Sequence, residues 1–138
     1  MLYNVNTKRI EEQLAYLDRC LTICEQLQNK KLSEVEEFAL SRSLHISVEC
    51  MIDVGSVMID GFIMRDPGGY EDIIDILEDE QVITADLAST IRQWVKLRER
   101  LVRYYTEVKT EELVKAAKEV LKVRSFIESI RQYLEKEL

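Results

Sequence analysis

Three arginines and two tyrosines gather between residues 98 and 105, and the side chains of Arg98, Arg103 and the tyrosines could together bind phosphate. Arg98 and Tyr105 are seven residues apart, about two turns of an α-helix, so on a continuous helix they share one face. Arg103 lies five residues after Arg98 and Tyr104 follows it. A guanidinium group binds phosphate oxygens in pairs, and a neighbouring phenol donates or accepts a hydrogen bond. The spacing therefore predicts a phosphate-facing cluster at the end of a helix.

The same segment also fits a purely structural interpretation. Glu99 and Arg103 are four residues apart with the acid first, the order that favours a surface ion pair worth about 0.2–0.5 kcal/mol. Arginines near the end of a helix can also satisfy its last carbonyl groups. From the residue types alone, a charged and solvated helix end is as good an interpretation as a functional one.

The composition restricts the classes of protein to which this chain can belong. It has 138 residues, 46% hydrophobic and 33% charged, which predicts a single folded domain spanning residues 1–138. The net charge of −7 argues against general nucleic-acid binding, so any contact with RNA must come from a local basic patch or from a groove between two copies. No apolar run approaches the roughly 20 residues of a membrane span, and the first residues lack the apolar core of a signal peptide. We therefore expect a cytoplasmic protein with no membrane contact.

The pattern of apolar residues predicts helices throughout the chain. Spacings of three and four residues indicate helices over about 7–29, 34–64, 70–80, 85–105 and 111–137. The expected caps are Asn6 or Thr7, the Ser33–Glu36 capping box, Thr84 and Thr110. Side chains expected on the buried faces include some that lie near helix ends: Val35, Phe38, Leu101, Val102 and Leu121. The prediction is an all-α fold, an up-and-down four-helix bundle with one additional short helix.

The second predicted helix carries the remaining candidates for chemistry. His45 is the one histidine of the chain, and a lone helical histidine is usually a packing or surface residue, so we expect no catalytic role. Glu49 and Asp53 lie four residues apart among apolar neighbours, so we expect each to have a partner elsewhere in the bundle, with orientation of Arg98 as one such role. Two acids are too few to hold a metal ion, and no metal is expected.

Gly55 and the three cysteines are expected to be packing residues. Gly inside a helix costs about 1 kcal/mol relative to Ala, so Gly55 predicts a close helix crossing that offsets this cost. Cys20 and Cys24 lie one turn apart, but no second Cys/His pair completes a zinc site. With Cys50 the count is odd, which fits reduced thiols in or near the core.

The order of these features resembles the HepT-like branch of the HEPN superfamily. That branch has a Glu-x-x-x-Asp helix, matched by Glu49 and Asp53, then a short helix, matched by residues 70–77. Its motif is an arginine, often followed by an asparagine, then three residues, a histidine, one residue and a tyrosine. Here Arg98 stands at the arginine position and Tyr105 at the tyrosine position. Glu99 replaces the asparagine, and Arg103 replaces the histidine.

The resemblance implies a function and a partner. It implies a ribonuclease fold that needs no metal or other cofactor and works as a homodimer, with two copies of the motif facing one cleft. It also implies a nucleotidyltransferase antitoxin of the MntA-like kind as partner. Such a partner can transfer AMP to the motif tyrosine, which would be Tyr105 here.

The arginine at position 103 determines how three possible functions rank. A general base needs a pKa near the working pH, and arginine stays protonated in proteins. The sequence therefore favours a homodimeric, degenerate ribonuclease or toxin homologue with weak or no catalysis, acting by binding RNA, a nucleotide or a partner. The second hypothesis is an active ribonuclease toxin that uses Arg98, Arg103 and Tyr105, supported by Glu49, Asp53, Glu99 and Tyr104. The third is a structural or adaptor bundle.

Overall fold

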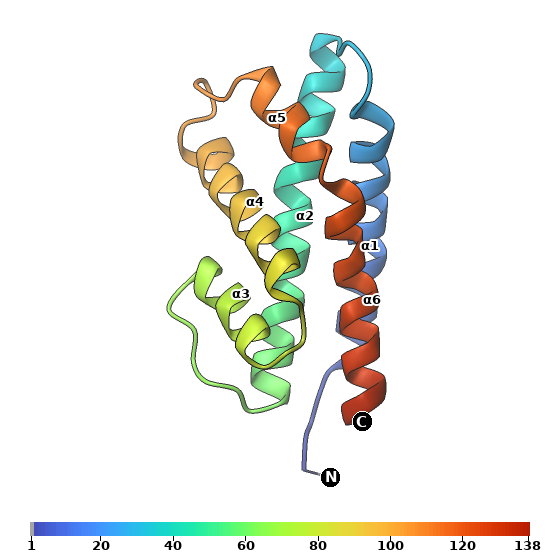
Figure 1. Cartoon of the computed structure of the whole chain (residues 1–138), viewed down its shortest axis with the longest axis vertical. Helices are drawn as coiled ribbons and strands as arrows, with labels where there is room; N and C mark the ends of the chain where they lie inside the picture. The colour runs from blue at the N-terminus through green and yellow to red at the C-terminus, as the bar shows by residue number, and fades with distance from the viewer. Residues whose placement is uncertain (1) are drawn as a thin grey trace.

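The computed structural model describes residues 2–138, and residue 1, where the predicted domain begins, lies outside the described residues. The described residues form only helices and connections, as Figure 1 shows. The helices are α1 (Thr7–Leu27), α2 (Glu34–Gly61), α3 (Tyr70–Asp79), α4 (Ala85–Arg103), α5 (Thr110–Ala117) and α6 (Val120–Glu137). The all-α prediction is therefore confirmed.

Helix α2 is the centre of the arrangement. It packs against α1, α3, α4 and α5, while α6 packs against α1 and α4. In Figure 1, α1, α2 and α6 run along the long axis of the molecule, and α4 crosses α2 at an angle. The short helix α3 lies beside α2 and α4 at the end opposite α5. A residue in the middle of α2 can therefore meet side chains from both α3 and α4.

The predicted helix starts are confirmed for the first, second and fourth predicted segments. The Asn6 side chain accepts a hydrogen bond from the backbone N–H of Arg9 (3.1 Å). Ser33 and Glu36 form the complete capping box at the start of α2. The Thr84 hydroxyl accepts from the backbone N–H of residue 87 (3.2 Å). These caps satisfy backbone donors that have no partner within the helix.

The expected close crossing at Gly55 is also confirmed. A Cβ atom built on Gly55 would lie 2.5 Å from Ile73 Cγ2, which is closer than side chains pack. The absence of a side chain on α2 thus lets α3 approach, and Tyr70, the first residue of α3, is brought toward α2.

Two helices end before the residues at which the sequence predicts their ends. The second ends at Gly61, where residues up to 64 were predicted, and the fourth ends at Arg103, where Tyr105 was predicted. At Tyr104 the backbone turns to φ −130° and ψ 42°, outside the helical region. No residue of α4 after Val95 is buried, so packing against the core does not hold a longer helix together.

The last predicted helix is two helices. Lys118 and Glu119 interrupt it between α5 and α6. Thr110 is the first residue of α5 and not its cap; Lys109 takes the cap position, and its backbone N–H donates to the Glu112 carboxylate (2.8 Å). The break lets α5 pack on α2 while α6 packs along α1 and α4. A straight helix would follow only one of these directions.

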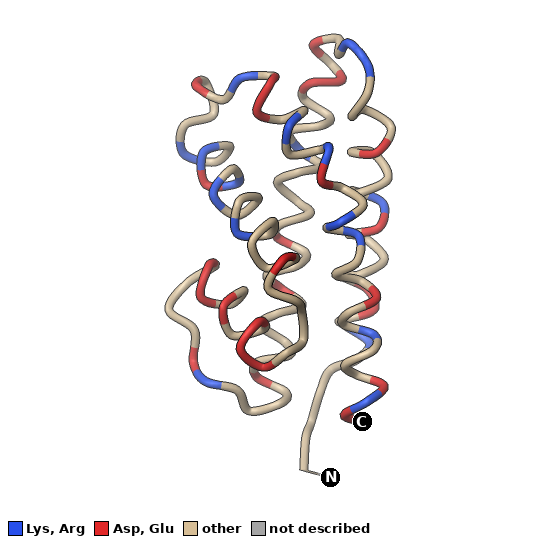
Figure 2. Tube along the Cα trace, in the orientation of Figure 1, with Lys and Arg blue, Asp and Glu red and all other residues tan. Residues whose placement is uncertain are grey.

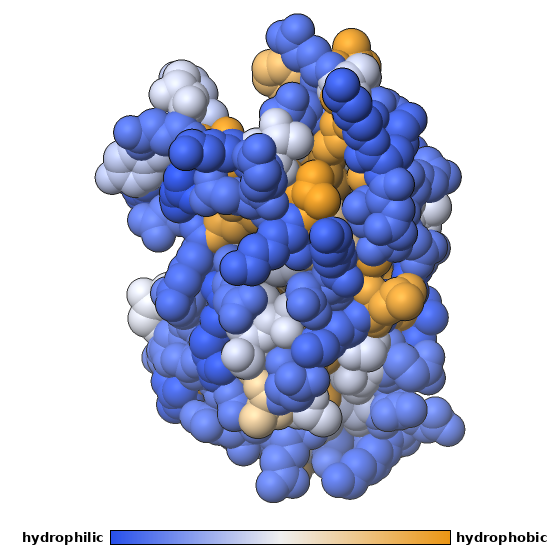
Figure 3. All heavy atoms as spheres, turned by 45° about the horizontal axis from the view of Figure 1, so that its top comes forward, coloured by the Kyte–Doolittle hydropathy of each residue, from blue (hydrophilic) through white to orange (hydrophobic). Residues whose placement is uncertain are grey.

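Several side chains expected in the core are exposed. Val35 and Phe38, in the first turns of α2, are 78% and 70% exposed because they lie on a side of α2 that its neighbouring helices leave open. Leu121 is 68% exposed because the buried face of α6 runs through Val120 and Val123 and leaves Leu121 on the outer side. Val102 is 40% exposed, and Leu101 is only partly buried although it still packs against the core, since both follow Val95, the last buried residue of α4. With the α5 end turned forward, Figure 3 shows the hydrophobic residues in separate patches within a hydrophilic surface.

All three cysteines are buried and carry free thiols, which confirms their expected place in the core. Burial raises the pKa of Cys24 and of Cys50 to about 12, so both stay protonated thiols at neutral pH. None of the helices from residue 2 onward combines the length and the apolar character that crossing a membrane requires.

Candidate functional site

Glu49 is the centre of a polar network formed by α2, α3 and α4. Its Oε1 accepts a hydrogen bond from Arg98 Nε (2.6 Å), and its Oε2 accepts one from the Tyr70 hydroxyl (2.9 Å). His45 Nε2 lies 3.5 Å from Glu49 Oε1. The guanidinium carbon of Arg98 also lies 4.5 Å from the centroid of the Tyr70 ring, a cation–π contact. We call His45, Glu49, Tyr70 and Arg98 the Glu49 network.

Each member of the Glu49 network is positioned by a feature of the fold. His45 and Glu49 are one helical turn apart on α2, so they share a face. The close approach of α3 at Gly55 brings Tyr70 within reach. The crossing of α4 over α2 places Arg98 opposite Glu49. Glu49 therefore has an arginine partner, as expected, and the contact is with Arg98.

Partial burial sets the protonation of the network. The side chains of Arg98 and Glu49 are 23% and 25% exposed, so water screens their attraction less than at the surface. Burial lowers the pKa of His45 below its ordinary value; Glu49 opposes this, while Arg42 and Arg98 add to it. His45 is therefore mostly neutral at pH 7 and able to accept a proton. Burial, together with the hydrogen bond to Glu49, raises the pKa of Tyr70, so its phenol keeps its proton.

Asp53 is not part of the network. In the described part of the chain it makes no hydrogen bond and no ion pair, so the arginine partner expected for it is absent. Burial raises its pKa, Arg9 lowers it, and Glu49 raises it further. Asp53 therefore acts on the site only through its charge, one turn after Glu49.

The other residues of the motif lie in solvent. Arg103 and Glu99 form the predicted ion pair at 3.8 Å, but their side chains are 68% and 61% exposed, so the pair stabilises the helix only weakly. Tyr104 and Tyr105 follow the end of α4 and are 54% and 70% exposed. The prediction that Tyr105 shares a helix face with Arg98 is wrong, because α4 ends before Tyr105.

Sequence reasoning missed two members of the network. The sequence predicts His45 to be a packing or surface residue, although its spacing of four from Glu49 is a usable signal. Tyr70 begins the third predicted helix, but nothing in the sequence links it to Glu49, which lies 21 residues away across a turn. Only the packing of α3 on α2 makes this contact.

The charges near the site are unevenly distributed. In Figure 2, Lys and Arg gather along the later part of α4, whereas α3 carries acidic residues. The guanidinium of Arg92 pairs with Asp75 (2.8 Å) and with Glu78 on α3. The basic end of α4 is thus a local exception in a chain of net charge −7, as RNA binding would require.

Comparison with known proteins agrees with this fold. The sequence profile of the HepT-like ribonucleases matches residues 10–134. The chain is 39% identical to YutE, a proposed RNase of Bacillus subtilis (strain 168), over 99% of this chain and 95% of YutE. The solved structure of YutE, described as a cytosolic protein of unknown function, superposes with a TM-score of 0.89, at 38% identity over 99% of this chain and 95% of that one.

More distant solved structures share the fold. A toxin–antitoxin structure with AMP-PNP has a TM-score of 0.83 at 19% identity, covering 91% of this chain and 98% of that chain. A mutant of the toxin–antitoxin pair MntA-HpeT has a TM-score of 0.81 at 20% identity, with the same coverage. The match of the family profile over most of the chain, with the close likeness to YutE, shows that this chain belongs to the HepT-like ribonuclease family of the HEPN superfamily.

Proposed function

We propose that this chain is a homodimeric HepT-like protein that binds RNA beside the Glu49 network and cleaves it weakly or not at all. The observation that carries the proposal is Arg103, which stands exposed at the histidine position of the motif. A guanidinium can bind a phosphate, but it cannot take the proton of a ribose 2′-hydroxyl at neutral pH. Glu99 beside it adds a negative charge that repels RNA phosphate.

The end of α4 supports the proposed dimer. Val102, Tyr104 and Tyr105 are exposed there next to Arg103. Aromatic residues and arginine are enriched in the cores of protein interfaces. A second copy covering this surface would bring two sets of Arg98, Arg103 and Tyr105 into one cleft, which is the arrangement that family membership implies.

RNA binding and dimerisation can be tested together. We expect dimers by light scattering at micromolar concentration, and binding of a fluorescent single-stranded RNA by anisotropy at low salt. Arg98→Ala should weaken this binding about 10-fold, because a hydrogen bond to a charged group contributes about 1.5–3 kcal/mol. Arg124→Ala is the matched control, since Arg124 is also a partly buried arginine paired with an acid, Asp18, but lies on α6.

The outcomes separate the candidate functions. Equal RNA affinity for the wild type and Arg98→Ala, in variants with normal helical circular dichroism, would contradict the RNA site. A strictly monomeric chain would remove the shared cleft. Absence of binding to both RNA and nucleotides would favour the structural or adaptor bundle.

A second candidate function, an active ribonuclease, is favoured by the place of His45. His45 is neutral near pH 7, lies 3.5 Å from Glu49 and is close enough to Arg98 for that charge to lower its pKa. It could accept the 2′-hydroxyl proton in place of the missing motif histidine. This candidate requires that RNA reach His45, whose side chain is 25% exposed.

The proposed partner is a nucleotidyltransferase of the MntA kind. The toxin–antitoxin neighbours support it, as does the exposure of Tyr105, because a phenol that is to be modified must reach a second active site. In the proposed transfer, the Tyr105 hydroxyl attacks the α-phosphorus of ATP, pyrophosphate leaves, and the phenol loses its proton. The description of YutE as cytosolic supports a cytoplasmic location.

Modification of Tyr105 has a clear mass signature. Incubation with an MntA-type enzyme, Mg²⁺ and ATP should add one adenylyl group to the wild type. Tyr105→Phe should abolish this addition, and Tyr104→Phe should keep it, since both tyrosines lie exposed after α4. Peptide mass spectrometry locates the group; label on Tyr104 or on another residue would contradict the assignment.

A further inference from the structure

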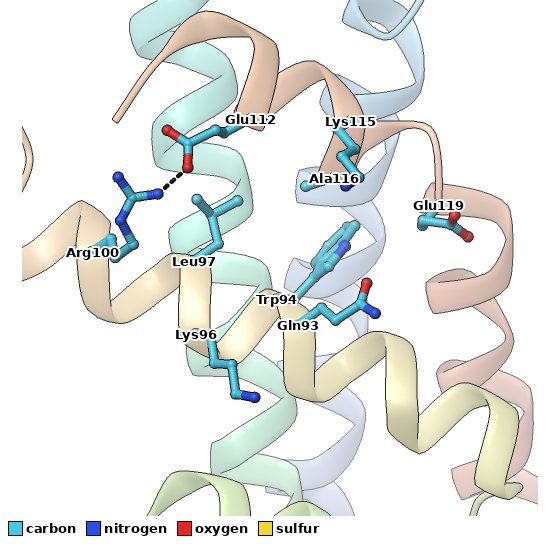
Figure 4. A pocket seen from close by; sticks show the side chains of 9 residues that line it. All are labelled: Gln93, Trp94, Lys96, Leu97, Arg100, Glu112, Lys115, Ala116 and Glu119. Atoms are coloured by element: carbon cyan, nitrogen blue, oxygen red, sulfur yellow. Dashed lines mark hydrogen bonds and ion pairs between the residues drawn. The ribbon is translucent and has the colours of Figure 1, made fainter. Parts of the chain in front are cut away.

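A cavity of about 340 Å³ lies between α4 and α5, on a different face of α4 from Arg98. Its wall includes Trp94 and Leu97 from α4 and Ala116 from α5, as Figure 4 shows. Lys96 and Lys115 line it from the two helices. The volume is in the range of small-molecule sites, and the mixture of an apolar wall with a few polar groups is typical of them.

Trp94 carries an unusual feature of this wall. Its side chain is 2% exposed, and its Nε1 is buried without a hydrogen-bond partner among the described residues. In Figure 4 the nitrogen edge of the indole ring is turned toward the side of the cavity where Gln93 and Glu119 lie. Buried donors in proteins nearly always have an acceptor. An orphaned N–H in a cavity wall therefore indicates an acceptor that comes from outside the chain.

The charges around the cavity indicate that the acceptor for the Trp94 N–H is an anion. Arg100 is paired with Glu112, and Glu119 lies 3.8 Å from Lys122. Lys96 and Lys115 form no ion pair within residues 2–138. Two uncompensated ammonium groups therefore remain on the wall, in a chain whose net charge is −7. Such a site attracts an anion.

We propose that this cavity binds a small organic anion, with a carboxylate or phosphate head group on an apolar ring. The head group would accept the hydrogen bond of Trp94 Nε1–H and face Lys115, while Lys96, whose side chain points away from the indole in Figure 4, would add only its positive charge. The ring would pack against Leu97, Ala116 and the indole. This site is separate from the Glu49 network and does not rest on the proposed function.

Trp94 provides the readout, because it is the one tryptophan of the chain. Its indole N–H gives a single resonance in a ¹⁵N-labelled sample. We expect saturable shifts of this resonance with benzoate or with phenyl phosphate. The probe that binds with the higher affinity identifies the preferred head group, a carboxylate or a phosphate. Benzamide has the ring without the charge, and inorganic phosphate has the charge without the ring; both should bind at least about 10-fold more weakly.

Matched variants test the contacts. Lys115→Gln should weaken binding of the tighter probe about 10-fold, the size of one hydrogen bond to a charged group. Lys96→Gln should weaken it less, because Lys96 contributes only its charge. Lys118→Gln, which alters an exposed lysine outside this cavity, and Arg98→Ala should leave binding unchanged. No indole shift with any probe, equal binding of benzamide, or full affinity in both lysine variants would overturn the proposal. In those cases the indole N–H is satisfied by Gln93 or by water.

Discussion

Replacing Arg103 with histidine is expected to raise RNA cleavage by about 10²–10⁴-fold, the usual contribution of general acid–base catalysis. The position is 68% exposed, so the new imidazole should titrate near the ordinary histidine pKa of about 6.5 and be largely neutral at pH 7. It can then accept the 2′-hydroxyl proton, which the guanidinium cannot. Cleavage of a fluorescent RNA by purified wild type and Arg103→His, at equal concentration, measures the gain.

The pH profile is the control for this prediction. Activity gained through a histidine base should fall as the pH drops below its pKa, because the protonated ring no longer accepts a proton. Arg103→Lys keeps a cation at the same position and should show no gain. If the wild type already cleaves RNA well and His45→Ala removes that activity, the second candidate function is correct and Arg103→His should add little.

The largest loss of stability is expected from Phe126→Ala. Phe126, on α6, is completely buried in the hydrophobic core. Removing its ring should lower the free energy of unfolding by about 3–5 kcal/mol, through lost transfer free energy and the cavity left behind. Urea denaturation followed by circular dichroism measures this difference.

Leu121→Ala is the matched control on the same helix. Leu121 is 68% exposed, so its truncation should change the free energy of unfolding by no more than about 0.5 kcal/mol. Equal losses for the two variants would show that Leu121 is covered in solution, contrary to its place on the outer side of α6.

The sequence predicted the helices well and their ends less well. Caps could be predicted, because a Ser33–Glu36 box or a Thr84 cap depends only on residues within one turn. The end of α4 and the break after α5 could not, because both depend on where neighbouring helices cease to cover an apolar side chain. Helix periodicity continues through Lys118 and Glu119 although the helix does not.

Only part of the candidate site could be predicted, because some of its contacts depend on how distant helices pack. The pairing of Glu49 with Arg98 followed from the need of a half-buried acid for a cation. Tyr70 joins them only because Gly55 allows a close approach of α3 to α2. Tyr105 was misplaced because seven residues equal two turns only while the helix continues.

One carboxylate thus serves three side chains from three helices, and this makes their contributions interdependent. Arg98 and His45 face the same oxygen of Glu49, while Tyr70 occupies the other. Truncating any one of them changes the geometry available to the other two, so single-variant free energies at these positions will not sum. Double-mutant cycles that include Glu49 can measure the coupling between these side chains. A substitution of His45 should change the free-energy effect of a substitution at Arg98, although these two residues share no hydrogen bond.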